Sequence, residues 1–183
     1  MRLFIAAPIP DTWHHRLRGL LTGLDLTGWA PTDPAGWHLT VRFIGERRPA
    51  EVDAVKALLH EVCASTSPYV LDASILCTMP AEKTGMIWLR SAPHGAHRAL
   101  HLRLSHALDL PPDDREPFWP HVTLARSTIR PPAPIEERTV PGELRVDRLA
   151  LYESRRTSEG LRYTPLLTLP LSGTAPVAPA AVA

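Results

Sequence analysis

The chain has 183 residues, enough for one domain or for two small lobes that share a core. Its net charge of +1 does not by itself imply a large polyanion-binding surface, but it is compatible with a small basic site for one or two phosphates. The 2 cysteines form no C-x-x-C pair and cannot build a disulfide framework, so a reduced, cytoplasmic setting is the expectation. No apolar run approaches the roughly 20 residues of a membrane-spanning helix.

The hydrophobic pattern of the first half predicts strands alternating with helices. In the strands the apolar residues run together or alternate, whereas in the helices they recur every three or four positions. Pro8 and Pro10 end the first strand, and Asp11 is a suitable N-cap for the first helix. The expected elements are strands at residues 3–7, 37–44, 69–76 and 86–89, with helices starting after Asp11 and at Pro49.

The second half repeats this order. Strand, helix, loop and an aromatic-led His-x-Thr strand thus occur twice, as an internal duplication would produce. We expect residues 1–171 to form a single bilobal domain, and residues 172–183, which lack apolar bulk, to be a disordered tail. The further expected elements are a helix at 94–108, a strand at 118–125, and a hairpin of strands at 145–152 and 161–169.

The two repeated strands carry histidine and threonine at matching positions. The segments read Trp37-His38-Leu39-Thr40-Val41 and Trp119-Pro120-His121-Val122-Thr123-Leu124. Side chains in a strand alternate between its faces, so His38 shares a face with Thr40, and His121 shares a face with Thr123. If the two halves pack about a pseudo-twofold axis, the two polar pairs meet across a cleft.

Two imidazoles and two hydroxyls around one cavity suit the hydrolysis of a cyclic phosphodiester. The attacking water loses a proton and the departing ribose oxygen gains one, and an imidazole with a pKa of about 6.5 can do either near neutral pH. The threonine hydroxyls can donate to the phosphate oxygens on which negative charge accumulates. The residues alone do not decide which histidine is the acid, and the scheme requires no metal.

The paired motifs resemble the duplicated His-x-Thr signature of the 2H phosphoesterases. Within that superfamily the chain is similar to the bacterial and archaeal RNA 2',3'-cyclic phosphodiesterases, historically called 2'-5' RNA ligases. The resemblance extends from about residue 2 to residue 171. Besides the motifs it includes Arg2-Leu3-Phe4-Ile5-Ala6, Phe43-Ile44-Gly45-Glu46, Leu124-Ala125-Arg126, Leu151-Tyr152-Glu153-Ser154 and Gly160-Leu161-Arg162-Tyr163.

The resemblance implies a bilobal α+β fold, with antiparallel sheets lining a central cleft and helices outside. It implies an enzyme that hydrolyses RNA 2',3'-cyclic phosphate ends to 2'-phosphate ends without cofactor or metal, with weak reversible 2'-5' RNA ligation. His38 would be the proton donor and His121 the proton acceptor, while Thr40, Thr123 and Arg126 would bind the substrate phosphate. The implied partner is a single-stranded or tRNA-derived RNA end, bound by a monomer and away from membranes.

Arg42 departs from the family pattern, in which a neutral residue is common at this position. Strand alternation places it on the face of His38 and Thr40, where it either contacts phosphate or bends into solvent. Two other functions also fit the sequence: another 2H cyclic phosphodiesterase that acts on a small nucleotide, and a non-catalytic protein that binds RNA ends.

Other aromatic and basic residues could contact RNA. Trp29, Trp37 and Trp119 could stack on a base, although packing in the core explains Trp37 and Trp119 at least as well. Several arginines could line an RNA path, but each is more simply explained as a solvated loop charge. These are Arg47, Arg48, Arg130, Arg155 and Arg156.

Histidines in the third predicted helix invite comparison with a metal site. His97 and His101 lie four residues apart and therefore on one helix face. No carboxylate or thiol lies at ligand spacing and no H-E-x-x-H motif occurs, so these histidines are expected to be solvated rather than metal-bound.

Overall fold

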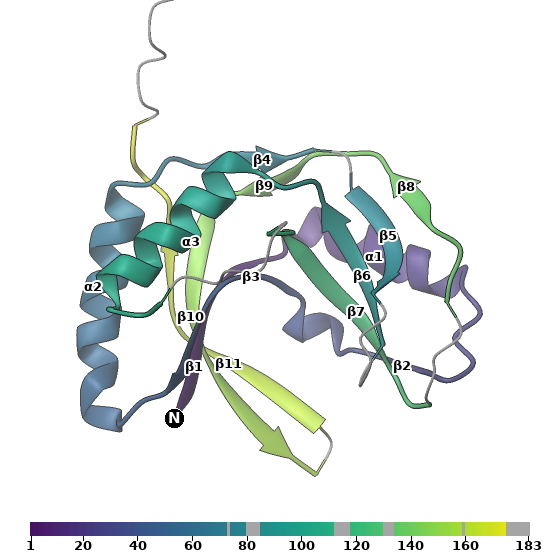
Figure 1. The fold of residues 1–183 in the computed structure, drawn as a ribbon, viewed down its shortest axis with the longest axis horizontal. Coiled ribbons are helices and arrows are strands. Elements are labelled where there is room, and N and C mark those ends of the chain that lie inside the picture. Colours follow the sequence, from purple (N-terminus) through teal and green to yellow (C-terminus); the bar gives the residue numbers. More distant parts are fainter. Residues whose placement is uncertain (73, 80–84, 112–117, 130–133, 159, 175–183) are drawn as a thin grey trace, which may run out of the picture.

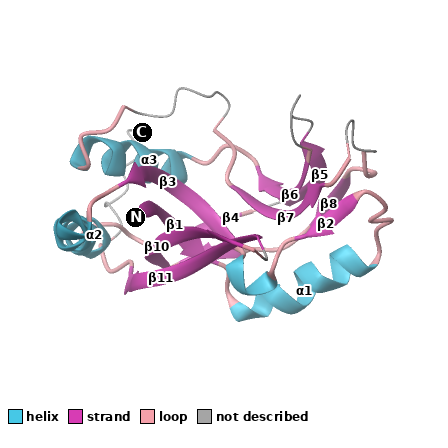
Figure 2. Ribbon diagram, turned by 90° about the horizontal axis from the view of Figure 1, so that it is seen from below, coloured by secondary structure: helices cyan, strands magenta, loops and turns pink. Residues whose placement is uncertain are grey.

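The chain folds into two antiparallel sheets that lie side by side, with helices packed on their outer faces (Figure 1, Figure 2). The structure is a computed structural model and describes residues 1–72, 74–79, 85–111, 118–129, 134–158 and 160–174. In these ranges the helices are α1 (Asp11–Thr22), α2 (Val52–Ala64) and α3 (Gly95–Ala107), with 3-10 turns η1 (Pro34–Gly36) and η2 (Pro49–Glu51).

The first sheet, here sheet A, joins the two ends of the chain. Its order is β11-β10-β1-β3, and every neighbouring pair is antiparallel. Helix α2 packs against β10 and β11, and α3 packs against β3, so both helices cover the same lobe. The strands are β1 (Arg2–Pro8), β3 (His38–Glu46), β10 (Arg148–Thr157) and β11 (Gly160–Pro170).

The second sheet, sheet B, forms the other lobe and has the order β2-β7-β6-β5-β8. Helix α1 lies along its outer side (Figure 2). A two-stranded sheet of β4 (Tyr69–Leu71) and β9 (Leu144–Val146) lies between the lobes. The strands of sheet B are β2 (Trp29–Pro31), β5 (Ser74–Met79), β6 (Met86–Ser91), β7 (His121–Ser127) and β8 (Arg138–Val140).

The helices form because their apolar residues fall on one stripe. In α1 the buried residues are Trp13, Leu17 and Leu21, spaced four apart along one face. The indole Nε1 of Trp13 also donates to the carbonyl of Glu143, 2.9 Å away, which ties α1 to the segment before β9. One continuous cluster of buried side chains, including Leu39 of β3 and Leu124 of β7, connects both lobes.

The predicted α+β class with antiparallel sheets is confirmed, as is the closing hairpin, now seen as β10 and β11. The strand predicted at 69–76 is two strands, β4 and β5, which belong to different sheets. Ser172 and Gly173 donate backbone hydrogen bonds to the carbonyls of Cys63 and Thr66, so ordered chain continues past Leu171. Most of the predicted tail, residues 175–183, lies outside the described residues.

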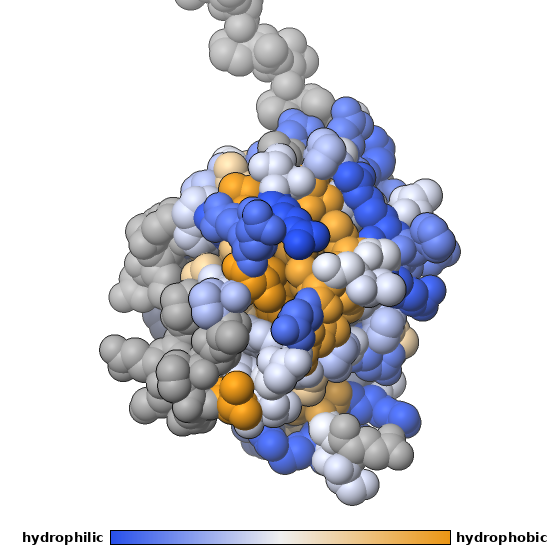
Figure 3. Space-filling model, turned by 90° about the vertical axis from the view of Figure 1, so that its right-hand side faces the viewer, coloured by the Kyte–Doolittle hydropathy of each residue, from blue (hydrophilic) through white to orange (hydrophobic). Residues whose placement is uncertain are grey.

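Helices in the described part of the chain are too short or too polar to cross a membrane. Seen from the side of sheet B, the surface has an apolar centre surrounded by mainly hydrophilic residues (Figure 3).

Candidate active site

The two His-x-Thr motifs begin strands β3 and β7, which belong to different sheets yet contact each other. The half-buried residues His38 and Thr40 alternate with buried residues in β3, and His121 and Thr123 do the same in β7. The alternation predicted from the sequence is therefore present in both strands.

A short hydrogen-bonded chain connects the two motif strands. Nε1 of Trp37 donates to the hydroxyl of Thr32 at 2.9 Å, and that hydroxyl donates to the backbone carbonyl of Thr123 at 2.8 Å. The backbone N–H of Thr32 also donates to the carbonyl of Leu124. The residue that precedes His38 is thereby held against the strand that carries His121.

The same irregularity follows the threonine in each motif strand. In β3, Thr40 pairs with Ala6 and Arg42 with Ile5, which leaves Val41 as the extra residue of a β-bulge. In β7 the pairing with β6 skips Leu124 in the same way. A bulge reverses the alternation beyond it, because one residue is added to a period of two.

The bulge in β7 brings Arg126 onto the face of His121. Simple alternation would direct Arg126 away from His121, but Arg126 pairs with Met86, two residues before the Trp88 that pairs with Thr123. Arg126 therefore shares the face of His121 and Thr123.

The bulge in β3 has the opposite effect on Arg42, which corrects the expectation from the sequence. Arg42 pairs with Ile5 and lies on the face away from His38 and Thr40. It is only 9% exposed, and its Nη2 donates to the carbonyl of Pro111 at 2.5 Å. Neither sequence-based alternative, a phosphate contact or a solvated side chain, describes this buried guanidinium. Phe43 takes the position that corresponds to Arg126, five residues after the histidine.

Both catalytic candidates hold their Nδ1 atoms in the same way. Nδ1 of His38 lies 2.6 Å from the carbonyl oxygen of Gly36, and Nδ1 of His121 lies 2.8 Å from that of Trp119. A carbonyl oxygen only accepts, so each Nδ1 carries the hydrogen. Nε2 is consequently the nitrogen that can exchange protons at each histidine.

The two imidazoles have different aromatic surroundings. The ring of Trp88 stacks on His121 with a centroid separation of 3.6 Å and an angle of 15° between the planes. His38 instead lies 4.8 Å from the ring centroid of Phe4 and 5.0 Å from that of Tyr163, which meets it edge-on. Sequence reasoning did not identify these aromatic residues; for Trp88 it predicted only a strand at residues 86–89, without its neighbours in the sheet.

Burial and charge control the protonation of His38. Burial lowers the pKa of His38 to about 4, while the hydrogen bond to the Gly36 carbonyl acts in the opposite direction. The positive charge of Arg126, and that of His121 whenever its ring is protonated, lowers the pKa further, so these three residues interact electrostatically across the two sheets. The sequence-predicted residues His38, His121 and Arg126 are therefore brought together.

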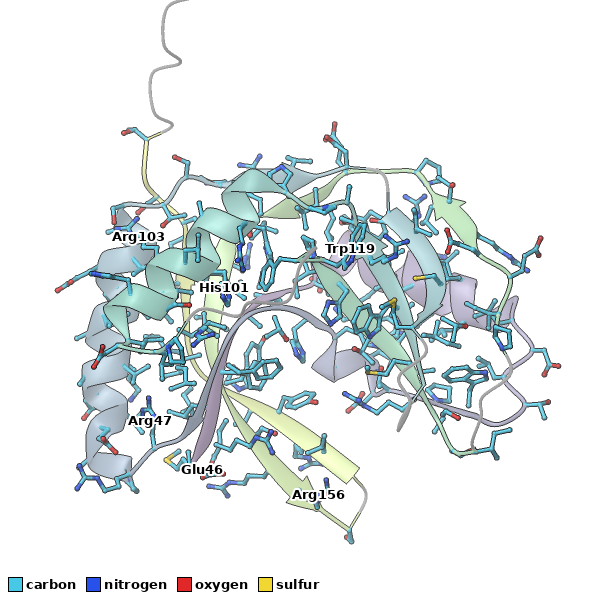
Figure 4. All side chains as sticks on the ribbon, in the orientation of Figure 1. Glu46, Arg47, His101, Arg103, Trp119 and Arg156 are labelled. Carbon is cyan, nitrogen blue, oxygen red and sulfur yellow. The ribbon has the colours of Figure 1, made fainter. Side chains whose placement is uncertain are left out.

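The histidines of α3 are buried, contrary to the solvated histidines expected. His97 is 0% and His101 is 2% exposed. Nδ1 of His101 donates to the carbonyl of Val41, the bulge residue of β3, at 2.8 Å, and Figure 4 shows His101 between α3 and β3. Nδ1 of His97 lies 2.7 Å from the hydroxyl of Tyr69. Across the described ranges, no group of three or more His, Cys, Asp or Glu side chains is placed to hold a metal ion.

The tryptophans considered as stacking partners are mostly structural. Trp29 and Trp37 are buried in the core. Trp119 is half-buried, and the guanidinium of Arg90 lies over its ring at 4.2 Å. Among the arginines, Arg48 pairs with Glu51, and Arg130 lies outside the described residues.

Comparison with known proteins agrees with this geometry. The sequence model of the 2'-5' RNA ligase superfamily matches residues 12–158 of this chain. An RNA 2',3'-cyclic phosphodiesterase of Thermus thermophilus is 31% identical over 184 residues, which cover 94% of this chain and 91% of that protein. A protein of the same name from Aquifex aeolicus is 28% identical over 143 residues, covering 72% of this chain and 76% of that protein.

Solved structures show the same fold. The crystal structure of TT0787 of Thermus thermophilus has a TM-score of 0.80 and 29% identity, covering 96% of this chain and 100% of that one. Apo LigT of E. coli has a TM-score of 0.73 and 23% identity, covering 93% of this chain and 97% of that one. With its duplicated motif strands meeting between two antiparallel sheets, the chain belongs to the 2'-5' RNA ligase superfamily of 2H phosphoesterases.

Proposed function

We propose that this protein is a metal-independent RNA 2',3'-cyclic phosphodiesterase that opens the cyclic phosphate to a 2'-phosphate. The relatives from Thermus and Aquifex bear this name. The observation that carries the proposal is the contact between β3 and β7, where the charges of His121 and Arg126 act on His38. Two proton-transfer groups and a cation at one point are what the hydrolysis of a phosphodiester needs.

The proposed reaction moves one proton at each histidine. Nε2 of His121 accepts a proton from water while the water oxygen bonds to phosphorus. The bond between phosphorus and the 3'-oxygen breaks, and Nε2–H of His38 gives that oxygen its proton. Thr40, Thr123 and Arg126 hold the non-bridging oxygens, whose negative charge increases in the transition state. The products are a 2'-phosphate and a free 3'-hydroxyl.

The role of His38 as proton donor couples its charge to substrate binding. With a pKa of about 4, the imidazole is mostly neutral at pH 7 in the free protein. A bound phosphate adds a negative charge nearby, which raises the pKa of the imidazole and favours its protonated form. We therefore expect substrate and proton to bind cooperatively, with tighter binding of phosphate as the pH falls.

The remaining parts of the proposal concern the substrate and the assembly. An RNA hydroxyl in place of water would attack the same phosphorus and form a 2'-5' linkage, so weak reversible ligation is included. The substrate is a single-stranded or tRNA-derived RNA end in the cytoplasm, and the protein acts as a monomer.

The test is incubation with an RNA that ends in a 2',3'-cyclic phosphate, in the presence of EDTA. The expected product is a 2'-phosphate end, resolved from the 3'-phosphate isomer by chromatography of the digested RNA. A purely 3'-phosphate product, or an unchanged end together with tight binding, would overturn the proposal. Faster turnover of a small cyclic nucleotide than of RNA ends would point to a different 2H substrate.

A further inference from the structure

The register of sheet A determines which side chains share the face of His38. Phe4 pairs with Phe43 on one side and with Tyr152 on the other. Paired residues project to the same face, and Phe4 lies two positions from Ala6, the partner of Thr40. The face that begins at His38 and Thr40 therefore continues across β1 and β10 as a strip of aromatic residues.

This strip forms a platform beside the catalytic candidate. Phe4 is buried at its centre, with Tyr152 stacked on it at 5.1 Å and Tyr163 edge-on at 5.2 Å. Phe43 packs against Phe4 at 6.0 Å between ring centroids but is 58% exposed. An exposed phenylalanine next to half-buried tyrosines is the kind of surface on which the bases of single-stranded nucleic acid stack.

Beyond the aromatic rings the same face becomes basic. Arg2 pairs with Ser154, and Arg156 lies two positions further along β10, so both arginines are on the face of His38. Both are exposed, and Figure 4 shows Arg156 on the hairpin of β10 and β11 near its turn. Glu46, also on this face, lies at the β3 edge, where its carboxylate is 3.5 Å from the N-terminal ammonium. The charges on this face therefore favour binding of an anion near the hairpin of β10 and β11 over binding near the β3 edge.

The neighbouring arginines point the other way. Arg155 pairs with Arg162, and both lie on the opposite face of the hairpin. Arg155 also forms an ion pair with Glu153, two residues earlier on that face, at 2.9 Å. Arg155 and Arg156 are adjacent in the sequence, but the register separates them onto two faces.

We propose that the face of Phe43, Tyr163, Arg2 and Arg156 binds the nucleotides that precede the cyclic phosphate, with bases on the aromatic rings and backbone phosphates at the arginines. This inference rests on the proposed function, which places the cyclic phosphate at His38. The cyclic phosphate closes the 3' end, so the rest of the RNA leaves the site in a single chain direction. On sheet A the strip of aromatic rings and arginines continues directly from His38. Aromatic rings can stack on bases and arginines can bind backbone phosphates, so this surface suits a single-stranded RNA.

The test measures binding of 5'-labelled RNAs of one, two, four and eight nucleotides that end in a 2'-phosphate, by fluorescence anisotropy over a range of salt concentrations. Wild-type affinity should rise with length. Arg156→Ala should weaken binding of the eight-nucleotide RNA about three- to tenfold and reduce the salt slope by about 0.7, as expected for one lost phosphate contact to a single strand. Phe43→Leu should weaken binding about fivefold or more by removing one stacking ring.

Arg155→Ala is the matched control, because it removes the same charge one residue away on the opposite face. It should leave both the affinity and the salt slope close to wild type. Equal losses in Arg156→Ala and Arg155→Ala, or an affinity that does not depend on RNA length, would overturn the inference. Hydrolysis of a mononucleotide 2',3'-cyclic phosphate is measured in parallel with the wild type. Absence of hydrolysis for both this mononucleotide and the eight-nucleotide RNA with a 2',3'-cyclic end would count against the proposed function, while the binding comparison separately decides the RNA path.

Discussion

His38 and His121 occupy equivalent motif positions but have unlike surroundings. Each donates Nδ1–H to a carbonyl two residues earlier, which leaves Nε2 as the nitrogen that can exchange a proton. His121 lies under the indole of Trp88, whereas His38 lies among Phe4 and two tyrosines. The local backbone therefore sets the tautomer of both histidines, and the neighbouring sheets supply the difference between them.

The two histidines should act as a unit. His38→Ala and His121→Ala should each lower kcat/KM for an RNA 2',3'-cyclic phosphate by at least about 10²-fold, because each removes one proton transfer. The double variant should lose much less than the product of the two losses, since either absence already disables the concerted step. Losses that multiply in this cycle, measured at one pH, would indicate that the histidines serve separate sites.

Arg126 should control the protonation of His38. Its positive charge lowers the pKa of His38, so Arg126→Gln should raise that pKa from about 4. The measurement is an NMR titration of the His38 ring proton in the free protein. Arg90→Gln is the control, because Arg90 pairs with His121 on the same face of sheet B. A pKa of His38 that stays unchanged in Arg126→Gln would show that the two side chains do not interact.

At the scale of secondary-structure elements, the bulges decide which residues belong to the site. The sequence correctly predicted the two motif strands and the alternation of histidine and threonine within them. Counting in steps of two fails beyond the threonine, because each strand contains one extra residue, Val41 or Leu124, that has no partner in the neighbouring strand. Such a bulge depends on how two strands pair, and one strand's sequence does not reveal it. Simple alternation placed both Arg42 and Arg126 on the wrong face, and the phosphate-binding role that the resemblance implies for Arg126 stays a prediction.

Other features could not be predicted because they depend on contacts between distant segments. The sequence pattern predicted that His101 is a solvated helix residue. It is instead buried, and it donates a hydrogen bond to the carbonyl of Val41, the bulge residue of β3. The aromatic neighbours of His38 come from β1, β10 and β11, whose order in sheet A does not follow the order of the chain. Strand period and motif spacing describe one segment at a time and cannot supply such pairings.

Arg42 should matter for stability rather than for catalysis. Arg42→Met removes the donor to the Pro111 carbonyl and should lower the free energy of unfolding by about 1–3 kcal/mol, measured by urea denaturation. Its kcat/KM should stay within a few-fold of wild type, because the side chain lies on the face away from His38. A loss of about 100-fold or more in kcat/KM at unchanged stability would instead place Arg42 at the phosphate.

On the scale of the whole molecule, two sheets from a duplicated pattern bring their motif strands into contact at one place. Near that contact His38 is half-buried, and His97 and His101 of α3 are buried. Burial lowers the pKa of His97 to about 3, and the charges of His121, His94 and His101 lower it as well, against the nearby Thr40 carbonyl. This packing therefore requires His38 and His97 to stay neutral near pH 7.

This requirement should make the fold sensitive to acid. Below about pH 6.5 the unfolded chain binds a proton at each of His38 and His97, whereas the folded protein binds them only near pH 4 and pH 3. The unfolded state then binds more protons, so stability is fully present above pH 6.5 and falls as the pH falls. The expected slope is about 1.4 kcal/mol per pH unit for each histidine. Urea denaturation between pH 7 and pH 4.5 measures it.

His97→Gln separates this effect from general acid denaturation. The variant is expected to be less stable than wild type at pH 7, because it loses the contact with the Tyr69 hydroxyl. Its stability should nevertheless fall less steeply with acid, by about 1.4 kcal/mol per pH unit, since one of the two titrations is gone. His60→Gln, on the exposed side of α2, controls for the loss of a histidine. If the stability of His97→Gln falls with acid as steeply as that of wild type, His97 takes up a proton in the folded protein as readily as in the unfolded chain, and its pKa is not lowered by burial.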